Sequence, residues 1–179
     1  MTPYAIDIVH SEIGFSVRHM VFAKVRGHFT KWSVDLAYDP ADPTRSTLTA
    51  SIDAASIDTR EPQRDGHLRS ADFLDADKYP KITFASRKVE RVGDKKYKVT
   101  GDLTIRDVKR EVSLDVDELG LGKDPWGNSR VGYSAKAAIN RGDFGLKWNQ
   151  ALETGGVLVG DKVEIEIEAQ VVSAPPKAA

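Results

Sequence analysis

The sequence contains no cysteine. This absence excludes disulfide bonds, thiol catalysis and cysteine-ligated zinc, and it is compatible with reducing and oxidising compartments alike. A strong charge imbalance is also missing, because 26 basic and 27 acidic side chains leave the 179-residue chain with a net charge of -1. No global field therefore attracts nucleic acid or an anionic membrane surface, and any anion site must be local.

Long apolar segments and enzyme motifs are lacking as well. No apolar run approaches membrane-spanning length, and the first residues show neither the basic segment nor the apolar core of a secretory signal, so we expect a cytoplasmic protein. The sequence has no P-loop, no G-x-S-x-G elbow, no dinucleotide fingerprint and no H-E-x-x-H motif, and its four histidines share no ligand spacing. These absences predict no catalytic residues, no cofactor and no metal site.

Alternation of apolar and polar residues is the main positive signal. In the clearest segment, Val163, Ile165 and Ile167 alternate with glutamates, so one face is buried and the other is wet. Similar segments elsewhere give about eight or nine strands separated by regularly spaced turns. Sequential hairpins of this kind predict an all-β protein and favour an antiparallel barrel over a sandwich. Such a barrel holds either its own side chains or one small ligand, and the pattern alone does not decide between the two.

One stretch, residues 60–84, does not alternate. Pro62 suits the first turn of a helix, and Leu68 and Ala71 fall three apart on one side. Pro80 disfavours helical backbone at the residue before it, so the helix must end by then and a strand follows at Lys81. We therefore expect a short helical insert around residues 60–75 that covers one side or one mouth of the sheet.

The apolar parity changes once, near Lys31. Val25 and Phe29 lie on one parity, whereas Trp32 and Val34 lie on the other. One extra residue in a strand moves every later side chain to the opposite face. The sequence therefore predicts a β-bulge at this position.

A few polar residues interrupt the apolar faces. His19 continues the parity of Phe15 and Val17, which would place its imidazole near one end of the lumen; a histidine bonded to a backbone carbonyl is the alternative. Arg141 and Trp148 flank the segment GDFGLK at the end of a strand, where an arginine could bind a phosphate at a barrel mouth. The alternative for this segment is a capped turn with an exposed tryptophan.

Several blocks of the sequence together form a recognisable pattern. They are Asp7, His10, Ser11, Ile13, Phe15, Val17 and His19, VRGHF at 25–29, DGHLRSADF at 65–73, YPKITF at 79–84, GDLTI at 101–105 and INRGDFG at 139–145. With these blocks, nearly the whole chain resembles the YceI-like polyisoprenoid-binding family. The resemblance implies an extended eight-stranded antiparallel, lipocalin-like β-barrel with a helix, enclosing a long apolar pocket. The sequence departs from the family at Asp107, where relatives often have glycine, and in the lack of a visible secretory signal.

Together, the pattern and the resemblance predict a single domain over residues 1–173 and a flexible tail at 174–179. They also predict that the protein binds one long-chain amphiphile without catalysis. The simplest ligand is a polyisoprenoid, such as a polyprenyl phosphate or a quinone-like lipid. An enzyme acting on an isoprenoid or quinone and an interaction module with a filled barrel are the alternatives. The resemblance also implies a homodimer. The residues expected around the ligand tail are Phe15, Val17, Phe29, Ile52, Phe84, Leu103, Ala135, Ala137 and Ile139. Those expected at the head group are His19, Arg60, His67, Asn140, Arg141 and Trp148.

Overall fold

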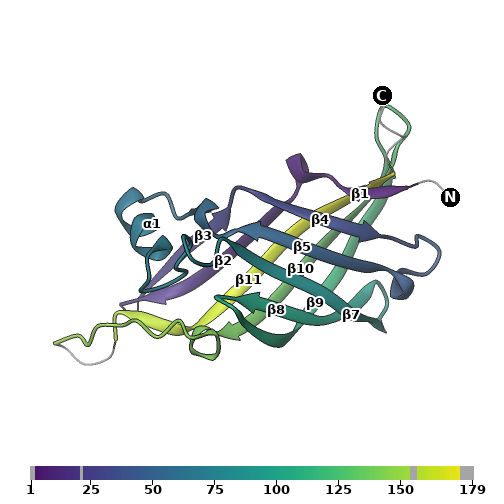
Figure 1. Ribbon diagram of the computed structural model, residues 1–179. Helices are drawn as coiled ribbons and strands as arrows, with labels where there is room; N and C mark the ends of the chain where they lie inside the picture. Colours follow the sequence, from purple (N-terminus) through teal and green to yellow (C-terminus); the bar gives the residue numbers. More distant parts are fainter. Residues whose placement is uncertain (1–2, 21, 154–156, 174–179) are drawn as a thin grey trace.

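The computed structural model describes residues 3–20, 22–153 and 157–173, and in these ranges the chain forms one strongly curled antiparallel sheet with eleven strands and a single α-helix at one end (Figure 1). The predicted tail at 174–179 lies outside the described residues. The strands are β1 (Tyr4–Ile6), β2 (Glu12–His19), β3 (Ala23–Phe29), β4 (Trp32–Ala37), β5 (Thr47–Asp53), β6 (Ile57–Asp58), β7 (Lys81–Gly93), β8 (Lys96–Ile105), β9 (Val108–Lys123), β10 (Ser129–Asn140) and β11 (Val159–Ser173).

The order of strands across the sheet is β4-β5-β7-β8-β9-β10-β11-β2-β3-β6, with β1 added beside β11. From β7 to β11, sequence neighbours are sheet neighbours, as hairpin connections require. The predicted antiparallel barrel-like fold is confirmed. The described part of the chain has eleven strands rather than eight, and the surplus includes β1 and β6, which are three and two residues long.

Residues 4–19 run along β11 as one strand interrupted by the 3-10 helix η1 (Ile8–His10). Ile6 is paired with Val171 and Ile13 with Ile167, so β1 and β2 share the same neighbour. At the first residue of β1, the Tyr4 ring packs in an edge-on arrangement with the ring of Tyr38, which follows β4. The two ring centroids are 5.1 Å apart. This contact draws the two sides of the curled sheet together at that end.

The change of apolar parity near Lys31 has a different cause from the predicted β-bulge, which is wrong. β3 ends at Phe29 and pairs with β2 and β6, whereas β4 begins at Trp32 and pairs with β5. The chain therefore crosses from one side of the curl to the other at this corner. Two backbone hydrogen bonds hold it to the 3-10 helix η3 (Ala54–Ser56) and its N-cap: Thr30 N–H donates to Ser56 O, and Asp53 N–H donates to Lys31 O.

The helix α1 (Pro62–Arg69) lies within the predicted insert. Pro62 occupies its first turn, and the Glu61 carboxylate accepts hydrogen bonds from two backbone N–H groups of that turn. The strand after the insert begins at Lys81, as predicted. Asp65 is buried and accepts hydrogen bonds from the Thr59 backbone N–H (2.9 Å) and hydroxyl (2.5 Å), which fixes the helix to the chain just after β6.

The core lies inside the curl, where alternate residues of the strands face one another. Phe144, in the 3-10 helix η4 (Arg141–Phe144), is the most buried large side chain at 2% exposure. Gly101 of β8 allows a close approach, because a Cβ atom there would overlap the Phe84 ring and the Ala85 carbonyl. β8 and β9 then join through Arg106 and Asp107, both with positive φ (51° and 66°), a backbone that aspartate tolerates and glycine would also suit.

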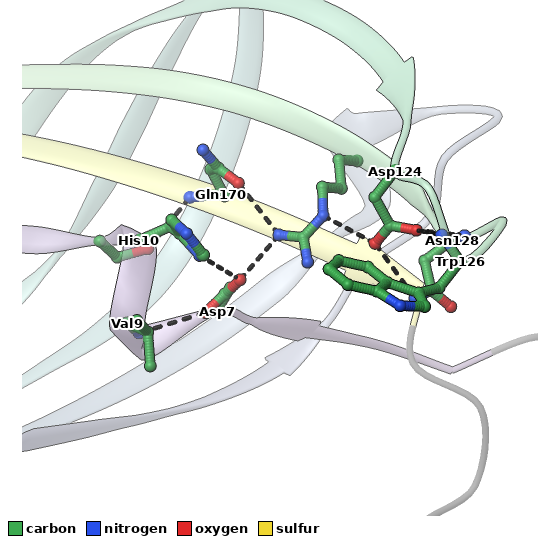
Figure 2. A network of polar contacts seen from close by, with 9 residues as sticks. Asp7, Val9, His10, Asp124, Trp126, Asn128 and Gln170 are labelled. Carbon is green, nitrogen blue, oxygen red and sulfur yellow. Dashed lines mark hydrogen bonds and ion pairs between the residues drawn. The ribbon is translucent and has the colours of Figure 1, made fainter.

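A polar network fastens β1, η1 and the β9–β10 hairpin to β11 on the outside of the sheet (Figure 2). The Arg130 guanidinium donates to Asp7 Oδ2 at 2.7 Å, to Gln170 Oε1 at 3.0 Å and to Asp124 Oδ2 at 3.0 Å. The hydrogen bond from Arg130 lowers the pKa of Asp7 to about 2. Burial raises the pKa of Asp124, but the hydrogen bonds it accepts from Asn128 and others lower it to about 2.

No helix among the described residues is both long enough and apolar enough to cross a membrane.

Candidate ligand-binding cavity

The curled sheet encloses a cavity of about 470 Å³ whose lining is almost entirely apolar. Ligand pockets in proteins typically measure about 300 to 1,000 Å³ and are mostly apolar, with a few polar groups that orient the ligand. The inward residues of β2 through β5 and β7 through β11 contribute to the lining. The barrel is therefore incompletely filled by its own side chains.

The structure places the predicted tail residues in this lining, with one exception. Ala137 has the inward parity of β10 and packs against the core, but it does not line the cavity. Contact of these residues with a ligand stays a prediction. The predicted tail residues that line the cavity are Phe15, Val17, Phe29, Ile52, Phe84, Leu103, Ala135 and Ile139.

At the end covered by α1, two of the predicted head-group residues lie in contact. The His67 ring stands edge-on to the Trp148 ring, with centroids 4.5 Å apart, and to the Phe73 ring at 5.0 Å. His67 Nε2 is bonded to the Asp72 carboxylate at 2.9 Å. These rings and His19 line the cavity, and His19, His67 and Trp148 stay partly exposed, so they form its mouth at the helix end.

Arg141 also lines the cavity, but its guanidinium is committed to the backbone. The side chain is 4% exposed, and it donates to the carbonyls of Leu146 (2.7 Å), Trp148 (2.9 Å) and Gly160 (2.9 Å). Burial lowers the pKa of Arg141, and the charge of Asp161 opposes this shift. These hydrogen bonds leave few N–H donors of Arg141 for a ligand. They hold the loop that carries Trp148 in place.

Two other predicted head-group residues lie away from the cavity. Asn140 is exposed, and its Oδ1 accepts a hydrogen bond from the Gly142 N–H (2.8 Å), which caps η4 as in the alternative of a capped turn. Arg60 is exposed in a left-handed conformation with φ 65°. Neither residue lines the cavity, so the structure does not bring them to the mouth with His67.

Sequence reasoning missed Arg64, which lines the cavity near its mouth. Its Nε donates to the Thr59 hydroxyl and its Nη2 to the Thr59 carbonyl, both at 2.8 Å. No sequence pattern could have singled this residue out, because its position follows from the docking of α1. Like Arg141, it holds the backbone around the mouth.

The opposite end of the cavity is lined by tyrosines that the sequence analysis did not single out. The hydroxyls of Tyr38 and Tyr133 share a hydrogen bond of 2.8 Å, and Arg91 donates to the hydroxyl of buried Tyr97 at 3.0 Å. Burial raises the pKa of both Tyr38 and Tyr133 above the ordinary tyrosine range, so both hydroxyls stay protonated even well above neutral pH. Parity alone places both rings inward, because Tyr38 continues the apolar row of β4 and Tyr133 that of β10, but it does not indicate that their hydroxyls meet.

Over residues 3–20, 22–153 and 157–173, no group of three or more histidine, aspartate or glutamate side chains is placed to hold a metal ion. At the helix end, Arg64 and Arg141 donate to backbone carbonyls, and at the opposite end Tyr38 and Tyr133 are hydrogen-bonded to each other. The arrangement suits enclosure of an apolar chain with polar groups at each end.

Comparison with known proteins agrees with this architecture. The UPF0312 protein SAS2572 of Staphylococcus aureus is 39% identical over 171 residues, which cover 95% of this chain and 97% of that protein. Among solved structures, the YceI protein of Campylobacter jejuni has a TM-score of 0.77 at 32% identity, over 98% of this chain and all of that one. BcnA of Burkholderia cenocepacia has a TM-score of 0.80 at 26% identity, over 92% of this chain and 98% of that one.

A polyisoprenoid-binding domain from Saccharophagus degradans has a TM-score of 0.65, over 98% of this chain and 100% of that one. Its sequence is only 16% identical, so the similarity is one of fold alone. The YceI-like domain family itself matches residues 4–171. The match therefore covers all eleven strands of the described residues and leaves out, within them, only the last two residues of β11. The chain belongs to the YceI-like family.

Proposed function

We propose that the protein binds one long-chain amphiphilic lipid, a polyisoprenoid, in its barrel cavity without transforming it. The observation that carries this proposal is the cavity of about 470 Å³ with its nearly continuous apolar lining. The fold shared with a polyisoprenoid-binding domain supports the same ligand class. Binding of this kind would serve storage, transport or shielding of the lipid.

The tail supplies most of the affinity. Burial of one five-carbon isoprene unit contributes ~4 kcal/mol gross at ~0.8 kcal/mol per carbon, before the entropy of ordering is subtracted. β11 is 15 residues long, so at ~3.3 Å per residue the strand extends about 50 Å and gives the barrel walls enough depth for several units. Few polar contacts are then needed for tight binding.

The head group lies at the helix end of the cavity, against His67 and Trp148. Of the arginines in the lining, Arg64 and Arg141 already donate to backbone carbonyls and to Thr59, whereas Arg18 of β2 is exposed. Arg64 and Arg141 would therefore offer few free donors to a diphosphate and contribute little to its affinity. The mouth suits recognition by ring stacking and single hydrogen bonds, which a quinone-like or alcohol head group can use as well as a phosphate.

Substitution of Ala135 tests whether the ligand occupies the cavity. Ala135 is 8% exposed and lines the cavity, so a tryptophan there would fill space that we assign to the lipid tail. Loss of even one isoprene contact corresponds to ~4 kcal/mol gross, so Ala135→Trp should weaken binding of farnesol at least tenfold.

The matched control is Ala138→Trp, because Ala138 lies on the same strand, is exposed and faces outward beside Glu164. Farnesol binding, followed by fluorescence titration, should be unchanged in this variant. Equal binding by both variants, with both folded by circular dichroism, would refute a ligand in the cavity.

A further inference from the structure

We propose that the tip formed by Met20 and Phe22, between β2 and β3, docks on an anionic membrane surface, from which the cavity takes up its lipid. This inference rests on the proposed function and names the partner that supplies the ligand. The tip lies at the same end of the barrel as α1, as Figure 1 shows for the ends of β2 and β3. A long-chain amphiphile resides in a bilayer, so the mouth of a cavity that takes it up must come close to one.

The tip exposes apolar side chains beside the mouth. Phe22 is 90% exposed and Met20 46% exposed, and Val157 before β11 is 45% exposed. The Met20 N–H donates to the Leu158 carbonyl at 2.8 Å, which holds the tip against the segment that leads into β11. Since His19 and Leu158 both line the cavity, the exposed apolar side chains continue directly from its lining.

The outward face behind this tip is positively charged, although the chain as a whole carries a charge of -1. Its exposed cations are Arg18 on β2, Lys24 and Arg26 on β3, and Lys162 on β11. Acidic side chains of β11 interrupt them: Glu164, bonded to Lys24 at 3.1 Å and to Lys162 at 3.5 Å, the exposed Glu166 on the same face, and the exposed Asp161 next to Lys162. We call Arg18, Lys24, Arg26 and Lys162 the basic face.

Two members of the basic face, Arg18 and Arg26, form no ion pair with any of the described residues, whereas Lys24 and Lys162 are each paired with Glu164. Arg18 lies directly opposite Lys24 across the β2–β3 ladder, a position in which like charges disfavour the sheet. The exposed Asp161 lies 3.7 Å from Arg141. Anionic headgroups would complement the two unpaired arginines, and this charge complementarity is the reason to assign the face to a membrane.

An apolar tip backed by lysine and arginine is the pattern of proteins that lie on membrane surfaces. The apolar side chains enter the boundary between headgroups and acyl chains, while each nearby cation contributes attraction to anionic lipids. In that orientation, the mouth formed by His19, His67 and Trp148 would face the bilayer. Lipid could then pass into the cavity with little exposure to water.

Co-sedimentation with vesicles tests the docking surface. The full-length protein should sediment with vesicles of phosphatidylcholine containing about a quarter phosphatidylglycerol, more weakly with phosphatidylcholine alone, and less at high salt, because salt screens exposed charges. Phe22→Ser should weaken partitioning about tenfold, as expected when one phenyl ring no longer enters the membrane. Lys24→Gln with Arg26→Gln should weaken it by a similar factor on anionic vesicles only.

Matched controls lie elsewhere on the sheet. Val92→Ser removes an apolar side chain that is 58% exposed near the β7–β8 turn, and Lys98→Gln with Lys123→Gln removes two cations from β8 and β9. Both control proteins should sediment as the unmodified protein does. Farnesol added without vesicles should bind to all of these proteins equally.

Sedimentation that is unchanged by Phe22→Ser, or that is weakened equally by the control substitutions, would overturn the docking surface. So would failure of the unmodified protein to sediment with anionic vesicles. Failure of the proposed function gives a different result, because the unmodified protein would then not bind farnesol in the absence of vesicles, whatever its behaviour on them.

Discussion

Replacement of Arg141 distinguishes a structural arginine from one that recognises a head group. Arg141→Met keeps most of the aliphatic side chain but removes the three short hydrogen bonds to the carbonyls of Leu146, Trp148 and Gly160. Hydrogen bonds to a charged group contribute about 1.5 to 3 kcal/mol each, and some of the released carbonyls will find water. We therefore expect a loss of about 3 kcal/mol in the free energy of unfolding.

The measurement is urea unfolding with linear extrapolation, in which the midpoint should fall and the m value should stay unchanged. Arg60→Met is the matched control, because Arg60 is exposed, and the free energy of unfolding should change by less than about 0.5 kcal/mol. At temperatures where the Arg141→Met protein is folded, farnesol and farnesyl diphosphate should lose affinity equally. A loss of less than about 1 kcal/mol in stability, together with selective loss of the diphosphate, would refute the structural role.

Two further substitutions test the fold around the cavity. Asp7→Asn should lower the free energy of unfolding at neutral pH. Because the folded-state pKa of Asp7 is depressed to about 2 and the stabilisation exists only while the carboxylate is charged, the difference from the unmodified protein should shrink as pH falls from 3.8 through about 2. A difference that does not shrink over this range would contradict the Arg130 contact. Gly101→Ala should lower the thermal midpoint, since overpacking typically costs about 1 to 3 kcal/mol, whereas Gly120→Ala, with no atom within 4 Å of the added Cβ, should have little effect. Equal midpoints for the two alanine variants would show that the Phe84 ring and the Ala85 carbonyl both move aside without cost.

Much of the architecture followed from parity. The alternation on β10 and β11 predicted which residues face the core, and the proline pair Pro62 and Pro80 bounded the helical insert. The predicted bulge near Lys31 failed because parity reports which face a residue occupies and not which strand it pairs with. A corner between unpaired strands and a bulge within one strand give the same pattern in the sequence.

The head-group site was harder to predict than the walls. Asn140 ends the strand that leads to the mouth and Arg141 follows it, but neither side chain is placed to bind a head group. Arg141 donates hydrogen bonds to backbone carbonyls, and Asn140 caps a turn. Backbone carbonyls left free at a loop are invisible in the sequence, so a buried arginine that satisfies them looks like one that awaits an anion. Arg64 reached the mouth only because Asp65 docks the helix beside Thr59.

The central claim is that the cavity holds a polyisoprenoid. Native mass spectrometry of the protein purified without detergent tests it most directly, because intact complexes report occupancy and the released lipid reports identity. We expect an added mass above the 19.7 kDa chain that dissociates as a lipid built from isoprene units. A protein that carries no such lipid, and that also fails to take up farnesol or a longer prenyl alcohol when these are supplied, would contradict the account.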